Sequence, residues 1–323
     1  MHARAWILII GGVLAISATV KSQTALPSPK PREPSWAFQV QEGSLPAESP
    51  EPKTIPGSTK KYTPKEIDDL NAPPDWFPDQ HPPAPEAVMK GRPGMLACGG
   101  CHLMSGLGHP ESADITGFTA AYFTQQMLDF RSGARNDFAA RMNPFAKALS
   151  EDEIKQVAEY FASLPRRKTG RVVEAAMVPK TFVGQGRMRF VDPKQTGMEP
   201  IGNRIITLPE NQEFARWRDP RPSSGFVSYV PPGSIKRGQV LAATGGPGKT
   251  ITCSFCHGDG LKGLGNVPRI AGLHPIYVAR QLIIFKEGLR NGPDAALMKK
   301  PVGQLTEADI IDLSAYVGSL NPE

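Results

Sequence analysis

Cys253-Ser254-Phe255-Cys256-His257 and Cys98-Gly99-Gly100-Cys101-His102 share the pattern C-x-x-C-H, and this pattern decides the fold of the chain. Two thiols at this spacing lie about one helical turn apart, so each can add to one vinyl group of the same porphyrin. The adjacent histidine then faces the iron as its proximal ligand. The motifs predict two covalently attached haem c groups. The residues that would hold them are Cys98, Cys101, His102, Cys253, Cys256 and His257.

These motifs contain all four cysteines of the chain, which leaves none for a disulfide. Zinc half-sites and redox dithiols also contain C-x-x-C and are the alternatives. A zinc site normally needs four nitrogen or sulfur ligands, and no βαβ pattern surrounds either motif as it would in a thioredoxin-like fold. The doubled C-x-x-C-H pattern therefore favours haem.

Length and composition indicate a soluble protein of two or three compact units. The chain has 323 residues, of which 40% are apolar and 21% are charged. Its formal net charge of +6 is small and scattered, so it does not indicate nucleic-acid binding. The charge favours an acidic protein partner, or it serves solubility alone.

The first 25 residues have the pattern of a secretory signal. A basic start at residues 1–4 precedes an apolar stretch at residues 5–16 that is too short to span a bilayer comfortably. Small residues follow, and Ala25 is one candidate for the cleavage site. We expect residues 1–25 to be a signal peptide, with an uncleaved membrane anchor as the alternative.

Residues 26–84 form a proline-rich lead-in, which we expect to be extended because proline removes backbone donors and favours polyproline II. We expect Trp36 and Phe38 to dock this tail onto a domain, and Trp76 and Phe77 to pack against a haem domain. His81 is a candidate iron ligand, with a surface or hydrogen-bonding role as the alternative.

An offset of 155 residues superposes the two motifs and continues well beyond them, which indicates a duplicated domain. Six residues recur at this offset: Tyr122, Gln126, Phe130, Gly133, Arg135 and Asn136 match Tyr277, Gln281, Phe285, Gly288, Arg290 and Asn291. After a one-residue insertion, Met142, Leu149, Ile154 and Tyr160 match Met298, Leu305, Ile310 and Tyr316.

Each copy is predicted to be a small helical unit that uses the porphyrin as its core. One helix should carry Tyr122, Gln126 and Phe130 and end near Gly133, and Ser150 and Thr306 should cap the last helices. We assign residues 85–168 and 233–323 to the two units. The connector, residues 169–232, should contain short strands at 186–191 and 203–208.

Met142 and Met298 are the candidate sixth ligands. Met142 lies 40 residues after His102 and Met298 lies 41 after His257, and we expect both in a loop before the last helix. A thioether opposite histidine raises the haem potential and fills the open position, which suits electron transfer. Core packing is the alternative, as for most methionines.

Several polar residues have less certain roles. The Pro268 carbonyl should accept from Nδ1 of His257, while Ala113 makes the same assignment less secure for His102. The pair Tyr122 and Tyr277, and the pair Arg135 and Arg290, could reach haem propionates, or instead form pocket wall and solvated surface. Residues 245–250 end like a phosphate-binding loop, but Ala243 replaces its first glycine, so no nucleotide site is expected.

With these residues in place, residues 85–323 resemble the tandem dihaem class I c-type cytochromes of bacterial periplasmic and respiratory electron transfer. The resemblance rests on the two motifs, the repeated helices, the two late methionines and the connector run between Arg218 and Gly238. It implies a mainly α fold of two class I cytochrome c domains in tandem, joined by an irregular, partly β connector. The proline-rich N-terminal extension departs from that pattern.

The resemblance also implies a function, which is one-electron transfer without catalysis, through two His/Met-ligated haem c groups. It implies export to the bacterial periplasm, and redox partners such as a quinol-linked complex, a periplasmic dehydrogenase or a terminal oxidase, with membrane association through the N-terminus left open. One alternative is a cytochrome subunit of such a dehydrogenase or oxidase. Another is a dihaem cytochrome c peroxidase, which needs a displaceable ligand and an acid-base group. His109 and His274 are the nearest candidates, each more typical of a surface or loop.

Overall fold

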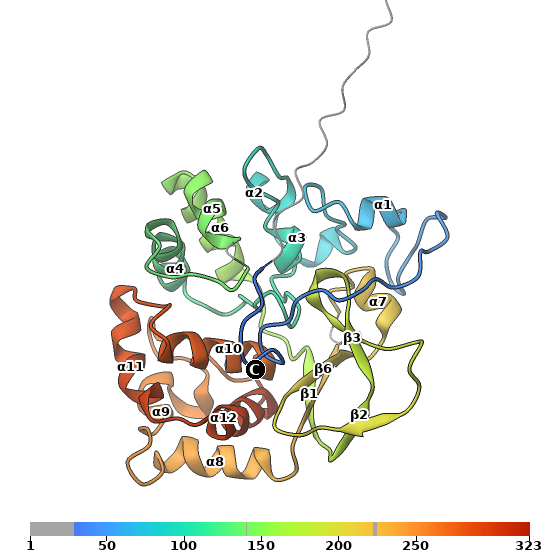
Figure 1. The fold of residues 1–323 in the computed structure, drawn as a ribbon. Helices are drawn as coiled ribbons and strands as arrows, with labels where there is room; N and C mark the ends of the chain where they lie inside the picture. Colours follow the sequence, from blue (N-terminus) through green and yellow to red (C-terminus); the bar gives the residue numbers. More distant parts are fainter. Residues whose placement is uncertain (1–28, 140, 222–224) are drawn as a thin grey trace, which may run out of the picture.

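The computed structural model describes residues 29–139, 141–221 and 225–323. Two helical units, one above the other in Figure 1, are flanked by the connector strands, and the lead-in runs between them. The predicted signal or anchor at residues 1–25 lies outside the described residues. Across the described ranges, no helix has the length and apolar character needed to cross a membrane.

The first unit is helical, as predicted. Its helices are α2 (Glu86–Met89), α3 (Gly99–His102), α4 (Ala120–Ser132), α5 (Met142–Ala148) and α6 (Glu151–Ser163). Helix α4 ends at Gly133, whose φ of 82° is the left-handed conformation that glycine tolerates. Ser150 and Glu153 form the predicted capping box at the start of α6.

The second unit repeats this arrangement. Its helices are α8 (Ser234–Thr244), α9 (Ser254–His257), α10 (Pro275–Lys286), α11 (Ala296–Gly303) and α12 (Glu307–Ser319), with 3-10 turns at Asp259–Leu261 and Pro293–Ala295. Helices α3 to α6 thus correspond to α9 to α12. The first helices differ, because α2 has 4 residues where α8 has 11.

The prediction that Met142 and Met298 lie in loops is wrong. Met142 is the first residue of α5, and Met298 lies in α11. The Met142 backbone N–H donates to Oδ1 of Asp137 at 3.2 Å, which satisfies one of the free donors at a helix start. Pro144 falls in the first turn of α5, where proline costs the helix no hydrogen bond.

The connector between the units is partly β, as predicted. Strand β7 (Phe226–Val230) lies in the middle of a three-stranded sheet, parallel to β1 (Gly170–Glu174) and antiparallel to β6 (Ile206–Pro209). Two small ribbons complete it: β2 (Met177–Pro179) pairs with β5 (Met198–Pro200), and β3 (Thr181–Val183) pairs with β4 (Arg189–Val191). A short helix α7 (Gln212–Arg216) follows β6.

Both predicted strands start later than expected. Residues 185–187 form a 3-10 turn because Gly186 and Arg187 have φ of 66° and 62°, so β4 begins only at Arg189. The predicted strand at 203–208 corresponds to β6, which begins at Ile206.

The lead-in is packed onto the rest of the molecule, although the only helices in its described residues 29–84 are α1 (Pro64–Ile67) and a 3-10 turn at Pro78–Gln80. Phe38 is buried in the core of the second unit, and Nε1 of Trp36 donates to Glu307 at 2.7 Å, so the predicted docking of this tail is confirmed. Trp76 instead packs against the connector: its Nε1 donates to the Trp217 carbonyl at 2.8 Å. Trp76 and Phe77 also line a small cavity with Met104 and Leu107 of the first unit, so the predicted packing against a haem domain accounts for only part of their contacts.

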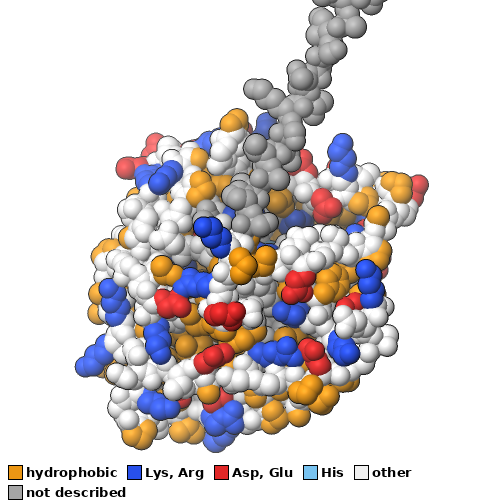
Figure 2. Space-filling model, viewed as in Figure 1, with side chains coloured by type: hydrophobic (Ala, Val, Ile, Leu, Met, Phe, Trp, Pro, Cys, Tyr) orange, Lys and Arg blue, Asp and Glu red, His pale blue; other side chains and the backbone are white. Residues whose placement is uncertain are grey.

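Charged side chains of both signs are interspersed over the face shown in Figure 2. Acidic and basic residues alternate there without forming a large patch of one sign. This distribution agrees with the modest formal net charge of +6.

Helices α8 and α12 cross closely at Gly238. A Cβ atom at this position would lie 1.9 Å from the Asp312 carbonyl oxygen and 2.9 Å from Cβ of Tyr316. Arg237 forms two hydrogen bonds to the Asp312 carboxylate, at 2.8 and 2.9 Å, beside the same crossing. Glycine at position 238 therefore allows the two helix backbones to touch.

We predict that Gly238→Ala destabilises the second unit, because the methyl group would force α8 away from α12. Overpacking of this kind costs about 1–3 kcal/mol, which chemical denaturation would measure. Gly303→Ala is the matched control, because nothing lies within 4 Å of a Cβ at that position. Equal unfolding midpoints for the two variants would contradict the close crossing.

Candidate functional site: two haem sites

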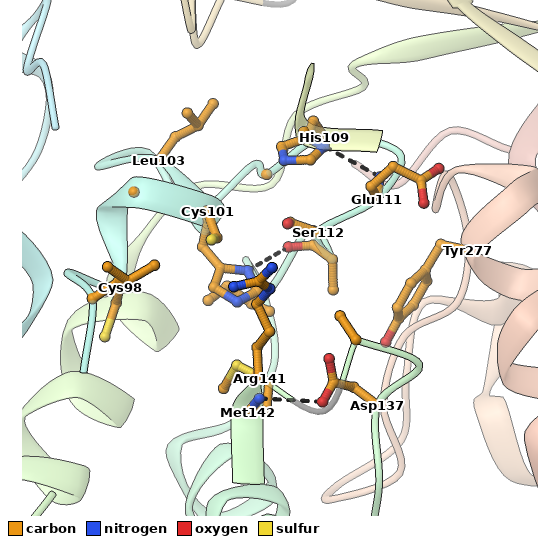
Figure 3. Close-up of a pocket in the computed structure, with 18 of the residues that line it drawn as sticks. Cys98, Cys101, Leu103, His109, Glu111, Ser112, Asp137, Arg141, Met142 and Tyr277 are labelled. Atoms are coloured by element: carbon orange, nitrogen blue, oxygen red, sulfur yellow. Dashed lines mark hydrogen bonds between the residues drawn. The ribbon is translucent and has the colours of Figure 1, made fainter. Parts of the chain in front are cut away.

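A cavity of about 450 Å³ brings together the predicted residues of the first haem site. Cys98, Cys101, His102 and Met142 all line it. Figure 3 shows the sulfur atoms of Cys98, Cys101 and Met142 around this space, with Tyr277 reaching in from the second unit. The surrounding side chains are mostly apolar, as suits a porphyrin face.

Each motif histidine has the tautomer that iron ligation requires. His102 Nδ1 lies 2.9 Å from the Ala113 carbonyl oxygen, and His257 Nδ1 lies 2.8 Å from that of Pro268. A carbonyl accepts only from N–H, so each Nδ1 carries the proton and Nε2 keeps its lone pair for a metal. Burial lowers the pKa of both histidines, which keeps the rings neutral. The Pro268 prediction is confirmed, and Ala113 provides the same contact.

The thiols do not have the character of a redox dithiol. All four cysteines are free, and burial raises the pKa of Cys98 to about 12 and that of Cys253 to about 11. Redox dithiols instead have a lowered thiol pKa. Within the described ranges, no group of three or more His, Cys, Asp and Glu side chains is placed to hold a metal ion. The raised thiol pKa values weigh against the dithiol interpretation.

The second site contains the same types of residue as the first, within the core of the second unit. Cys253 and Met298 pack against the same apolar core of the second unit. His257 is buried at the end of α9, and the backbone N–H of Gly263 donates to its carbonyl at 2.7 Å. In the first unit Gly108 donates to the His102 carbonyl at 2.9 Å, so the backbone around both histidines is the same.

The two motifs differ most in what covers them. Gly100 of the first motif is buried, and a Cβ there would lie 2.8 Å from the Leu70 carbonyl oxygen of the lead-in. Arg218 of the connector donates to the Gly100 carbonyl at 2.6 Å. Phe255 takes the equivalent place in the second motif and is 80% exposed. The lead-in and the connector therefore cover the first motif and leave the second open.

The repeated residues meet at the boundary between the units, where they form a reciprocal interface. Arg290 donates to Oε1 of Gln126 at 2.7 Å, and Arg135 donates to Oε1 of Gln281 at 3.2 Å. The backbones also pair, because the Asn136 N–H donates to the Leu289 carbonyl at 3.1 Å. Such reciprocity is expected where two copies of one domain meet about a twofold axis.

The two arginines in this interface are buried without an acidic partner. Arg135 is 9% exposed and Arg290 is 7% exposed, so the interpretation as solvated surface is wrong. Their polar side-chain partners are the glutamines and tyrosines of the interface, and no carboxylate among the described residues forms an ion pair with either. Burial and the proximity of Arg290 lower the pKa of Arg135. A buried positive charge requires an anion, and the propionates of a haem in the adjoining cavity fit that requirement.

The other three histidines in the described part of the chain have different roles in the structure. His81 contacts Asp75 at 3.2 Å and lies outside the cavity, so it is not placed as an iron ligand. His274 is buried beside Phe226 and Thr169 rather than at the surface, and burial lowers its pKa to about 4. His109 lines the cavity and accepts from the Glu111 N–H at 3.2 Å. In Figure 3 it lies away from Met142.

Residues 245–250 lie in the loop between α8 and α9. This agrees with the prediction that they do not form a phosphate-binding loop. Lys249 of this loop is engaged by Asp309, with contacts of 2.9 and 3.0 Å. The four-residue helix α9 follows it, where a phosphate-binding loop needs a long helix.

Asp114 and Arg269, which no sequence motif indicated, form a fully buried ion pair between the units. The signal was present in the repeat, since the two residues are equivalent at the offset of 155 and carry opposite charges. Each also directly follows a residue whose carbonyl accepts from a motif histidine.

Comparison with known proteins agrees with these sites. The family model for cytochrome c matches residues 235–321. Cytochrome c4 of Stutzerimonas stutzeri is 34% identical over 156 residues, covering 46% of this chain and 69% of that protein. Cytochrome c4 of Pseudomonas aeruginosa is 25% identical over 228 residues, covering 69% and 84%. The thiosulfate dehydrogenase electron acceptor of Thiomonas intermedia is 25% identical over 230 residues, covering 70% and 79%.

The doubled motif, the repeated helical units and these relatives agree with one another. They also leave the peroxidase interpretation without support, since the relatives are cytochromes and an electron acceptor. The chain therefore belongs to the tandem dihaem class I c-type cytochromes, which carry electrons on two covalently attached haem c groups.

Proposed function

We propose that this chain is a one-electron carrier with a histidine and a methionine ligand at each haem site, and that it exchanges electrons with protein partners through its second unit. The first cavity carries the proposal, because Cys98, Cys101, His102 and Met142 line it together. Haem c supplies the reversible one-electron couple when it is bound.

The proposed ligands divide into proximal and distal pairs. His102 and His257 present Nε2 to the iron because their Nδ1 protons are bonded to carbonyls. Met142 and Met298 would fill the opposite position, which raises the potential and closes the site to small ligands. His109 lies away from Met142, so it does not supply the acid-base group that a peroxidase needs on the open face.

We further propose residues 85–168 and 233–323 as the two cytochrome c domains, joined by a connector at 169–232 and preceded by a lead-in at 26–84. The correspondence of α3–α6 with α9–α12 supports these limits. Export to the bacterial periplasm, with a signal or anchor at residues 1–25, remains part of the proposal.

Met298→His should lower the midpoint potential of the second haem and leave that of the first unchanged, because imidazole stabilises ferric iron more than a thioether does. Met142→His should produce the mirror result. Potentiometric titration followed in the visible region resolves the two potentials, and the near-infrared methionine–iron band should lose half its intensity in each variant.

Met177→Leu is the control for both variants, because Met177 is a methionine of β2 in the connector and does not line the cavity. It should leave both potentials and the near-infrared band unchanged. An unchanged potential in Met298→His would mean that Met298 is not the ligand.

Arg135 offers a second test of the haem sites. Arg135→Leu should lower the potential of the first haem, because it removes a buried positive charge that favours the ferrous state. Arg135→Lys keeps the charge and should shift the potential less. Arg131 in α4 donates to the backbone carbonyls of Ala146 and Leu149 and does not itself line the cavity, so Arg131→Leu should leave the potential unchanged.

The open edge of the second motif supports electron exchange at the second unit. Phe255 and Leu264 are 80% and 60% exposed, and a Cβ on Gly258 of the same motif region would lie 3.5 Å from Leu264. Lys262, Lys299 and Lys300 are exposed on the segments that flank this site. An apolar area with basic residues around it favours a redox partner with an acidic rim.

Partner binding can be tested with a carboxylate-coated gold electrode as a defined acidic surface. Leu264→Asp should slow interfacial electron transfer by about tenfold, which corresponds to ~1.4 kcal/mol of lost docking free energy. The control is Met198→Asp, since Met198 is an exposed apolar residue of β5 in the connector. Equal slowing in the two variants would contradict exchange through the second unit.

One relative supports a proposal for the class of the natural partner. The Thiomonas intermedia protein is named as an electron acceptor of thiosulfate dehydrogenase. We propose by analogy that a dehydrogenase is one side of the electron route in this chain. A quinol-linked complex or a terminal oxidase would be the other side.

A further inference from the structure

One ion pair joins the two loops whose backbone carbonyls accept hydrogen bonds from the motif histidines. Ala113 accepts from His102 and is followed by Asp114, while Pro268 accepts from His257 and is followed by Arg269. The Arg269 guanidinium lies 2.5 Å from Oδ2 of Asp114. A short covalent and ionic path therefore runs from one motif histidine to the other.

This ion pair is completely enclosed. The Arg269 and Asp114 side chains are 0% and 2% exposed, and Arg269 is among the largest fully buried side chains in the described part of the chain. Arg269 also donates to the carbonyls of Thr116, at 2.8 Å, and Ala271, at 3.0 Å. All three side-chain nitrogens of Arg269 are therefore hydrogen-bonded. Each of them bonds to one of the two loops whose carbonyl, that of Ala113 or of Pro268, accepts from a motif histidine.

The Asp114 carboxylate is also fixed by hydrogen bonds. Oδ1 of Asp114 accepts from the backbone N–H of Thr116 at 2.9 Å and from its hydroxyl at 2.8 Å. Arg269 in turn donates to the Thr116 hydroxyl oxygen at 3.1 Å. The geometry of the carboxylate relative to the Ala113 carbonyl is thus set by three hydrogen-bonded groups.

Duplication alone would place the same residue at both positions. Opposite charges at equivalent positions instead allow each segment to bind the other across the domain boundary. Burying two charges costs desolvation free energy, so such a pair is weak evidence for stability and better evidence for a specific geometry.

We propose that Asp114 and Arg269 are positioning residues that set the potentials of both haems together. The hydrogen bond at Nδ1 determines the basicity of each proximal imidazole, and a more basic ligand favours the ferric state. Because one ion pair holds both acceptor carbonyls, a change in the pair alters both ligands. This inference rests on the proposed ligation by His102 and His257.

The test is the double variant Asp114→Asn/Arg269→Gln, which removes the pair without changing the net charge. A single variant would leave an unpaired buried charge, whose own field would move the potentials. In the double variant both midpoint potentials should rise, because both Nδ1–H bonds weaken. The Nδ1 protons of both histidines, followed by NMR in the ferrous protein, should exchange with solvent about tenfold faster.

The matched control is Arg237→Gln/Asp312→Asn, an ion pair within the second unit that contacts neither acceptor segment. It should leave both potentials unchanged. Thr116→Val provides a milder change, because it removes only the hydroxyl shared by Asp114 and Arg269, and it should raise both potentials by a smaller amount. If the double variant does not bind two haems, the potentials of Thr116→Val test the inference instead.

A shift confined to one haem, or unchanged potentials and exchange rates in a variant with two haems, would overturn the inference. Failure of the proposed histidine ligation would look different, since the wild-type protein would then lack the low-spin spectrum of two histidine-ligated haems. The wild-type spectrum and the variant potentials therefore test the two proposals separately.

Discussion

The hydrogen bond between each motif histidine and a backbone carbonyl is the contact on which the rest of the structure depends. It fixes the tautomer of His102 and of His257, and so it decides which nitrogen faces the haem cavity. The loops that supply the carbonyls of Ala113 and Pro268 also provide the buried ion pair between the units. Ligand geometry and domain docking therefore have the same origin in this fold.

Duplication gives the protein its symmetry, and the lead-in and connector remove part of it. The interface is reciprocal, with Arg135 and Arg290 each bonded to a glutamine of the other unit. The motifs are not equivalent in their surroundings, because Gly100 lies under the lead-in whereas Phe255 faces solvent. The two similar motifs thus differ in how far the surrounding chain covers them.

The sequence predicted the helical units, the capping residues and the two motifs, because these depend on local spacing and on the internal repeat. It did not predict the helices that contain Met142 and Met298, since a short helix after a loop has little signal of its own. The packing of Trp76 on Trp217 was also missed, because it joins segments 141 residues apart. For the same reason Arg269 appeared only as one more charged residue until its partner in the other unit was known.

The central claim is that both haems are low-spin, with a histidine and a methionine ligand, and serve electron transfer alone. Spectroscopy of the purified protein, combined with a redox titration, tests it most directly. The account predicts two haems c per chain and a near-infrared methionine–iron band from both in the ferric state. One high-spin haem together with rapid turnover of peroxide would contradict it.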